Sequence, residues 1–153
     1  MKLSSVLAPE RIKLGLSGSR KADVIAELCD LAVASGRVHD RDEVLRLFYA
    51  REELKSTGIG HGVAIPHAQS DSVEGIVVAL GVSRRDIDYD ALDHQPVHIV
   101  FLIAAESHQS IPYLSLLSRI SRLMRKDDLR ARLIDAGSPG EALAIIEDEE
   151  RDW

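Results

Sequence analysis

Three kinds of residue pattern that would point to particular protein classes are scarce in this chain. It has one cysteine, Cys29, among 153 residues, so it can form no internal disulfide, and we expect a buried thiol in a reducing compartment. No apolar run approaches the roughly 20 residues that a membrane-spanning helix needs. Residues 1–10 also lack the pattern of a signal peptide. The sequence therefore predicts a cytoplasmic protein with no direct membrane insertion.

Basic and aromatic residues are also few. Lys and Arg number 19 against 25 Asp and Glu, which gives a formal net charge of −6. Domains that bind nucleic acid usually present a basic face, so we expect no nucleic-acid partner. Aromatic residues make up 4% of the chain and hydrophobic residues 45%, so Leu, Ile, Val and Ala must fill the core. This length and composition suit a single domain, 1–153.

The first third of the chain has helical spacing of apolar residues. A first helix is expected to be capped by Ser19 and to end at Gly36. A second helix is expected to begin at Asp40 and Glu43, which form a pair like a capping box. This second helix would carry Arg51 in its last turns, just ahead of a glycine-rich loop.

The middle of the chain contains runs of strand length. Residues 63–67, 76–82 and 97–104 are largely apolar, which is typical of strands that are covered on both faces. Residues 84–95 are polar and acidic and are expected to form a surface connection.

The last third is expected to be helical. Pro112 suits the first turn of a helix with one apolar stripe, and Asp127 is expected to cap a shorter helix. Ser138 and Glu141 form a capping box for a final helix, and residues 147–153 are expected to be a charged C-terminal tail. Strands separated by helices predict a three-layer α/β fold.

The most informative stretch is residues 56–68, which read STGIGHGVAIPHA. Glycine permits unusual backbone angles and proline fixes the angle next to His67, so this histidine is expected to be held in one pose. We expect no metal site, because no set of three or four ligands with zinc spacing is present, and no G-x-S-x-G elbow predicts a hydrolase. The remaining interpretation is a nucleophilic or titrating histidine that lies beside glycine amides, hydroxyls and an arginine. Such groups can bind phosphoryl oxygens. A structural turn histidine is the simpler alternative.

Three motifs carry a resemblance to a known family. The sequence reads ARE at 50–52, STGIG at 56–60 and AIPH at 64–67, and it resembles the enzyme IIA domain of the bacterial phosphotransferase system, fructose, mannitol and nitrogen-related class. The resemblance extends over nearly the whole chain, from LSSVL at 3–7 to LSLL at 114–117. It implies a three-layer α/β sandwich with a mixed central sheet of about five strands flanked by helices.

The resemblance also implies a site and its partners. His67 would accept a phosphoryl group from an HPr-type histidine phosphocarrier and then pass it to a IIB domain or signal to a regulated target protein. Arg51, Thr57, Gly58 and Gly60 would contact the phosphoryl group. No cofactor is implied. The chain would act as a covalent phosphohistidine intermediate rather than a free-standing catalyst, so its assignment as an enzyme is left open.

The chain departs from the family at one position. The family usually has a second histidine at the start of the late helix, and Tyr113 occupies that place here. A phenol can donate a hydrogen bond, but with an ordinary pKa of about 10 it carries no positive charge, so Arg51 would supply most of the electrostatic stabilisation. His61 and His108 are candidates to tune the site. Simpler interpretations stay open: an exposed charge for Arg51, a turn former for Thr57, a core residue for Tyr113 and a loop residue for His61.

Two functions from different classes follow. The favoured hypothesis is a phosphoryl-carrier and regulatory protein of the phosphotransferase system, and a free-standing chain favours the nitrogen-related regulatory branch over a sugar permease component. The alternative is a phosphorylation-independent regulatory binding module with the same fold, because Tyr113 replaces the second histidine. A metal-dependent enzyme is a distant third.

Overall fold

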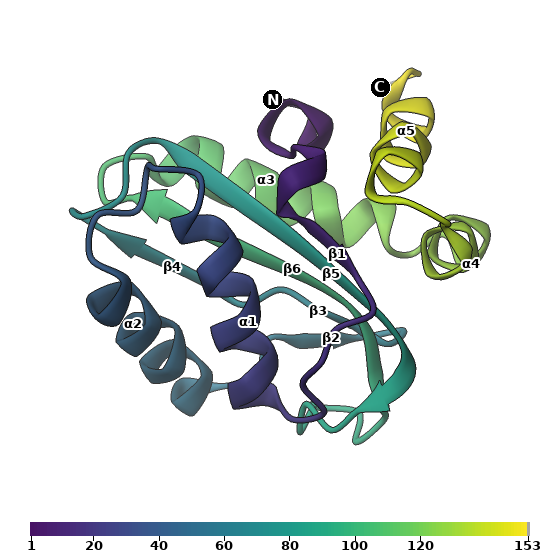
Figure 1. The fold of residues 1–153 in the computed structure, drawn as a ribbon, viewed down its shortest axis with the longest axis horizontal. Helices are drawn as coiled ribbons and strands as arrows, with labels where there is room; N and C mark the ends of the chain where they lie inside the picture. The colour runs from purple at the N-terminus through teal and green to yellow at the C-terminus, as the bar shows by residue number, and fades with distance from the viewer. Residues whose placement is uncertain (153) are drawn as a thin grey trace.

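A six-stranded mixed sheet lies between two layers of helices in the computed structural model, which describes residues 1–152 (Figure 1). None of the helices in this range is long and apolar enough to cross a membrane. The elements follow in the order η1 (Leu3–Val6), η2 (Pro9–Arg11), β1 (Ile12–Leu14), α1 (Lys21–Val33), α2 (Arg41–Leu54), β2 (Gly58–Gly60), β3 (Val63–Ala64), β4 (His67–Ser70), β5 (Ile76–Ile87), β6 (Val97–Glu106), α3 (Ser110–Leu123), α4 (Asp127–Asp135) and α5 (Pro139–Glu150).

The antiparallel pair β5 and β6 forms the centre of the sheet. Strand β1 extends it parallel to β5, and β3 and β4 lie end to end, parallel to the other edge of β6. The expected single strand at 63–67 is therefore two strands, because Pro66 has no N–H to donate and interrupts the pairing. This break gives six strands within residues 1–152 rather than about five, and the predicted mixed three-layer fold is confirmed.

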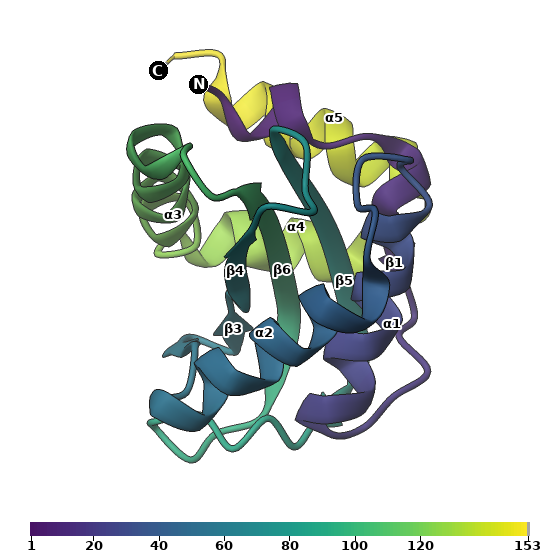
Figure 2. The same ribbon diagram turned by 90° about the vertical axis from the view of Figure 1, so that its left-hand side faces the viewer.

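Side chains of the two central strands alternate between the helix layers, as the pleat of a strand requires. Val78, Leu80 and Phe101 pack in the core formed with α3, α4 and α5. Ala79 and Leu102 pack in the second core, against α1 and α2. Figure 2 shows α2 in front of the strands and α4 behind them. Because both faces are covered, these strands read as continuous apolar runs in the sequence.

Two of the predicted helix caps are correct and two are wrong. Asp40 and Ser138 each accept a hydrogen bond from the backbone N–H three residues later. Ser19 does not cap α1, because Arg20 holds the N-cap position and the Ser19 carbonyl accepts from the Asp88 N–H instead. Asp127 does not cap α4, because it is the first residue of that helix.

Strand β5 is longer than expected and ends at Ile87 rather than near residue 82. Residues 84–86 are exposed, which explains their polar composition, but Ile87 is buried and pairs with Val97 across an irregularity in the ladder. The surface connection expected at 84–95 therefore begins at residue 88, four residues later than predicted, because polar residues at an exposed strand end resemble those of a loop.

Of the segment expected to be a charged tail, 147–153, residues 147–150 belong to α5, and residue 153 lies outside the described residues. Glu150 is fully buried, and its carboxylate accepts hydrogen bonds from the N–H groups of Leu3 at 2.7 Å and Ser4 at 2.8 Å. Arg119 of α3 lies 3.3 Å from the same carboxylate. One side chain thus joins the first helical turn, α3 and α5, and Figure 1 shows the two ends of the chain close together.

Candidate functional site

His67 is the first residue of β4, directly after the break in the edge strand. Its Nδ1 lies 2.6 Å from the carbonyl oxygen of Ile65. A carbonyl can only accept, so Nδ1 carries the proton and Nε2 keeps its lone pair. The N–H of Ile65 in turn donates to the carbonyl of Thr57 at 2.9 Å. The backbone therefore fixes the tautomer in which Nε2 is the nucleophilic nitrogen.

The surroundings of His67 favour its neutral form. Burial lowers the pKa of His67 below its ordinary value of 6.5, and the positive charge of Arg51 lowers it further. The carbonyl of Ile65 and the negative charge of Glu52 oppose this shift. Neutral imidazole is the nucleophilic form, so the site keeps its nucleophile at neutral pH.

Tyr113 of α3 lies against His67. The two ring centroids are 5.8 Å apart, with an angle of 62° between the ring planes. Burial raises the pKa of Tyr113, so the phenol stays protonated and can donate a hydrogen bond but carries no charge. The residue also heads the predicted apolar stripe of α3, in which Leu116, Ile120 and Leu123 are buried.

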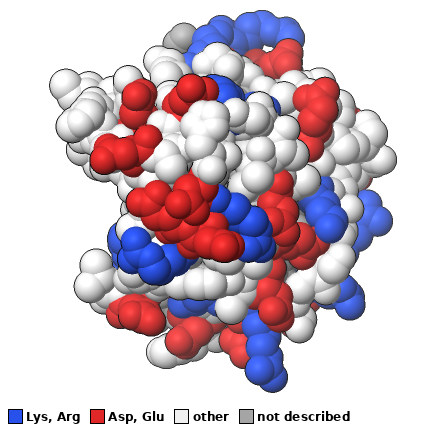
Figure 3. Space-filling model, turned by 60° about the vertical axis from the view of Figure 1, so that its left-hand side comes forward, with Lys and Arg blue, Asp and Glu red and all other residues white. Residues whose placement is uncertain are grey.

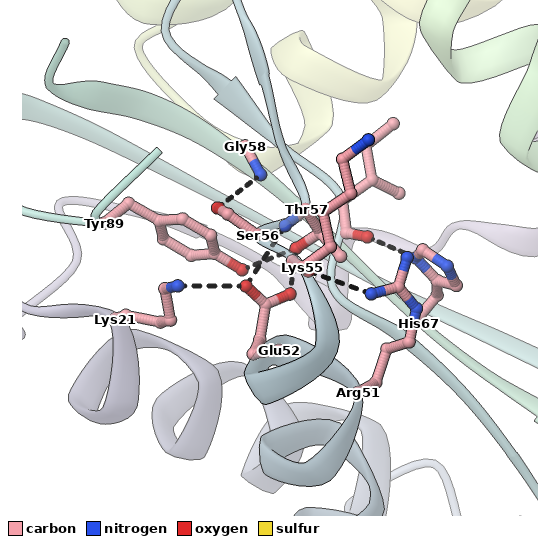
Figure 4. Close-up of polar contacts among 10 residues, drawn as sticks. Lys21, Arg51, Glu52, Lys55, Ser56, Thr57, Gly58, His67 and Tyr89 are labelled. Atoms are coloured by element: carbon pink, nitrogen blue, oxygen red, sulfur yellow. Dashed lines mark hydrogen bonds and ion pairs between the residues drawn. The ribbon is translucent and has the colours of Figure 1, made fainter. Parts of the chain in front are cut away.

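Arg51 lies in the last turn of α2, where a cation is favoured by the helix dipole. Its Nη1 donates to the carbonyl of Lys55 at 2.9 Å, which fixes the guanidinium beside His67 (Figure 4). The charge of Arg51 adds to the lowering of the His67 pKa and opposes the rise that burial causes in the Tyr113 pKa, so all three groups share one electrostatic environment. The structure therefore brings together the predicted residues Arg51, His67 and Tyr113.

Thr57 is buried, and its hydroxyl takes part in a polar network that the sequence did not reveal. The hydroxyl contacts the Glu52 carboxylate and lies 2.9 Å from the hydroxyl of Tyr89. Lys21 Nζ lies 3.2 Å from Glu52 Oε1 (Figure 4). A role for Thr57 as a phosphoryl ligand stays a prediction.

One pattern in the sequence could have identified Glu52 as buried. Val44, Phe48 and Glu52 recur every four residues on α2, and all three are buried. A carboxylate on the apolar face of a helix must find partners, so this spacing predicts a buried polar network. Lys21 and Tyr89 carried no comparable signal, because they reach Glu52 from distant parts of the chain.

Gly58 is required by close packing rather than by its backbone angles. A Cβ at this position would lie 2.6 Å from the Cβ of Ala91, which is too close for any real contact. The N–H of Gly58 donates to the hydroxyl of Ser56 at 3.1 Å. Gly58 therefore shapes the loop that follows α2.

The other predicted glycine lies away from His67. Gly60, with φ +92°, is the last residue of β2, and His61, with φ 58°, begins the turn to β3. Gly60 pairs with Val63 and so lies level with Ile99 on β6, whereas His67 lies level with Ile103. Four residues of strand span about 13 Å. The structure does not bring Gly60 or His61 next to His67.

His108 is exposed in the turn between β6 and α3. Within residues 1–152 no group of three or more His, Cys, Asp and Glu side chains is arranged to hold a metal ion. The site therefore consists of a nucleophilic histidine, an arginine, a protonated phenol and a buried carboxylate network behind the loop at 55–57.

Large apolar side chains are exposed on the elements that carry the site. Leu54 is 82% exposed three residues after Arg51, and Ile111 and Leu114 are 84% and 61% exposed on either side of Tyr113 in α3. Acidic and basic residues are interspersed on the face in Figure 3, and no large basic patch covers it. Exposed apolar residues beside reactive side chains suit a surface that contacts another protein.

Known proteins are similar to this chain in sequence and in fold. Residues 5–149 match the family model described as phosphoenolpyruvate-dependent sugar phosphotransferase system, EIIA 2. The chain is 37% identical over 151 residues to a fructose-specific EIIABC component of the phosphotransferase system from Bacillus subtilis, covering 99% of this chain and 24% of that protein. It is 38% identical over 136 residues to a fructose-specific EIIA component from Haloferax volcanii, covering 89% of this chain and 88% of that protein.

A solved structure extends the comparison to the fold. The crystal structure of the nitrogen regulatory protein IIA-Ntr from Neisseria meningitidis superposes with a TM-score of 0.87 at 27% identity, covering 94% of this chain and 98% of that chain. The family match covers nearly the whole sequence and agrees with the resemblance found from the motifs. The chain belongs to the EIIA 2 family of the phosphoenolpyruvate-dependent sugar phosphotransferase system.

Proposed function

We propose that this protein is a phosphoryl carrier and regulator that accepts a phosphoryl group on Nε2 of His67 from an HPr-type histidine phosphocarrier. The observation that carries the proposal is the 2.6 Å contact between His67 Nδ1 and the Ile65 carbonyl, which leaves the Nε2 lone pair available. Family membership supports the same reaction class.

The transfer needs little acid or base catalysis. The Nε2 lone pair of His67 attacks the phosphorus of the donor's phosphohistidine, the donor's P–N bond breaks, and the donor imidazole keeps that electron pair. The proton on Nδ1 stays in its hydrogen bond to Ile65. Positioning and charge stabilisation therefore account for most of the rate.

Arg51 and Tyr113 are the groups that would stabilise the phosphoryl oxygens. The phosphoryl group brings about −1.5 to −2 charges, part of which the single positive charge of the Arg51 guanidinium offsets. Tyr113 supplies a neutral O–H donor, because burial keeps its phenol protonated. The face around them, with Leu54, Ile111 and Leu114 exposed, would contact the phosphocarrier and then a IIB domain or a regulated target in the cytoplasm.

The test is phosphorylation of the purified protein with phosphoenolpyruvate, enzyme I and an HPr-type carrier, followed by intact mass spectrometry. We expect one phosphoryl group on the wild type, one on the control His61→Ala, and none on His67→Ala. Label that persists on His67→Ala would move the acceptor to another residue, and His108 would be mapped first.

A second candidate function is a phosphorylation-independent binding module, which the neutral Tyr113 in place of the family's second histidine favours. The control is another IIA protein, which the same donors must phosphorylate in the same reaction. If the wild type then takes up no phosphoryl group, the result would support the binding-module function and contradict the phosphoryl-carrier function.

A further inference from the structure

The buried carboxylate of Glu52 lies directly behind the loop that leads from α2 to β2. This loop is only three residues long, 55–57, because α2 ends at Leu54 and β2 begins at Gly58. Glu52 Oε1 accepts the backbone N–H of Thr57 at 3.2 Å, and Oε2 contacts the Thr57 hydroxyl. The carboxylate therefore holds both the backbone and the side chain at the far end of the loop.

The directions of the hydrogen bonds follow from the chemistry of the groups. A carboxylate can only accept hydrogen bonds, so the Thr57 hydroxyl donates its hydrogen bond to Glu52. The Tyr89 hydroxyl must therefore donate to the oxygen of the Thr57 hydroxyl. Lys21 supplies the compensating charge at 3.2 Å from Glu52, and its Nζ lies 5.0 Å from the centre of the Tyr89 ring. Every polar group in this network has a partner.

The same loop connects to both reactive side chains. The Thr57 carbonyl accepts the Ile65 N–H at 2.9 Å, and the Ile65 carbonyl accepts Nδ1 of His67 at 2.6 Å. At the other end of the loop, the Lys55 carbonyl accepts Nη1 of Arg51 at 2.9 Å. Two chains of hydrogen bonds thus run from the loop, one to the nucleophile and one to the cation.

Burying a carboxylate costs free energy, because the charge is removed from water. Well-packed apolar residues often stabilise a protein more than a buried ion pair does, so the stability of the fold alone does not explain Glu52 and Lys21. The network does explain how a single short loop fixes the tautomer of His67 and the place of Arg51 at once.

We propose that Glu52 is a positioning residue, which through the Thr57 loop holds His67 with Nε2 as the nucleophile and holds Arg51 beside it. The inference rests on the proposed phosphoryl transfer, although the positioning of His67 can be measured without any phosphoryl donor. It assigns Thr57 the role of a link in this chain of hydrogen bonds.

The test compares four variants by NMR of the His67 ring nitrogens and by the rate of phosphorylation. Glu52→Gln removes the charge, and Thr57→Val removes only the hydroxyl link. Thr57→Ser restores that link, and Glu53→Gln removes an exposed carboxylate from the next position of the same helix. Far-UV circular dichroism establishes that each variant is folded.

We expect the His67 ring nitrogens of Glu52→Gln and Thr57→Val to shift toward a mixture of tautomers. We also expect transfer to slow by on the order of 10- to 100-fold, since a misplacement of about 1 Å at a reacting centre has effects of this size. Thr57→Ser and Glu53→Gln should match the wild type in both measurements. A purely structural role would lower stability and leave the tautomer of the folded protein unchanged.

Unchanged ring nitrogens in folded Glu52→Gln and Thr57→Val would overturn the inference. If Glu52→Gln does not fold, Thr57→Val decides alone. If the wild type accepts no phosphoryl group from active donors, the proposed function fails, and the ring nitrogens still decide whether Glu52 positions His67.

Discussion

Replacement of Glu150 by alanine tests the finding that the end of the chain is part of the fold. The carboxylate is fully buried and accepts the N–H groups of Leu3 and Ser4 at 2.7 and 2.8 Å, with Arg119 at 3.3 Å. Each hydrogen bond to a buried charged group contributes about 1.5–3 kcal/mol. Glu150→Ala removes two such bonds and leaves their donors without this acceptor, so we expect the free energy of unfolding to fall by about 3 kcal/mol or more.

The loss is measured by urea unfolding followed by far-UV circular dichroism. In a chain of this size 3 kcal/mol corresponds to a decrease of about 6–12 °C in Tm. The matched control is Glu147→Ala, an exposed residue of the same helix, which should change stability by less than about 0.5 kcal/mol. Equal free energies of unfolding for the two variants would refute the conclusion that Glu150 stabilises the fold by joining the two ends of the chain.

Four further predictions concern the site. Arg51→Ala should raise the pKa of His67, measured by NMR titration, and should slow phosphorylation more than it lowers Tm; equal rates would make Arg51 an ordinary surface charge. Because burial lowers the folded pKa of His67, the unfolded chain binds more protons below pH 6.5, so the free energy of unfolding should decrease as pH falls from 6.5 toward the folded value, and His67→Ala should lack this contribution. Gly58→Ala should destabilise by about 1–3 kcal/mol in urea unfolding, because its Cβ meets Ala91, and an unchanged midpoint would contradict the packing. Tyr113→His should speed phosphorylation if a second positive group limits transfer, and an unchanged rate would mean that the phenol already suffices.

The central strands and the layers could be predicted from the sequence because their signals are local. The run 97–104 is apolar except for His98, and a near-continuous apolar run of this length is typical of a strand covered on both faces. The caps at Asp40 and Ser138 were also predicted, since a capping side chain bonds to the backbone three residues later. The glycines and the proline around His67 predicted a histidine held in one pose, and the structure shows the hydrogen bond from Nδ1 to the Ile65 carbonyl that holds it.

The errors arose where a local pattern has two structural meanings. Polar residues 84–86 at an exposed strand end look like a loop, and acidic residues in the last turn of a helix look like a tail. Glu150 contacts residues almost a whole chain away, and Lys21 and Tyr89 meet Glu52 only in the folded protein. Contacts between residues so far apart in the chain produce no periodic pattern in the sequence, so they could not be predicted from it.

The central claim is that Nε2 of His67 carries the phosphoryl group while Nδ1 keeps its hydrogen bond to Ile65. The most direct test is NMR of the histidine ring nitrogens before and after phosphorylation by the HPr-type carrier. We expect a phosphorus coupling at Nε2 of His67, with Nδ1 protonated in both states. Phosphorylation at Nδ1, or on any other residue, would contradict it.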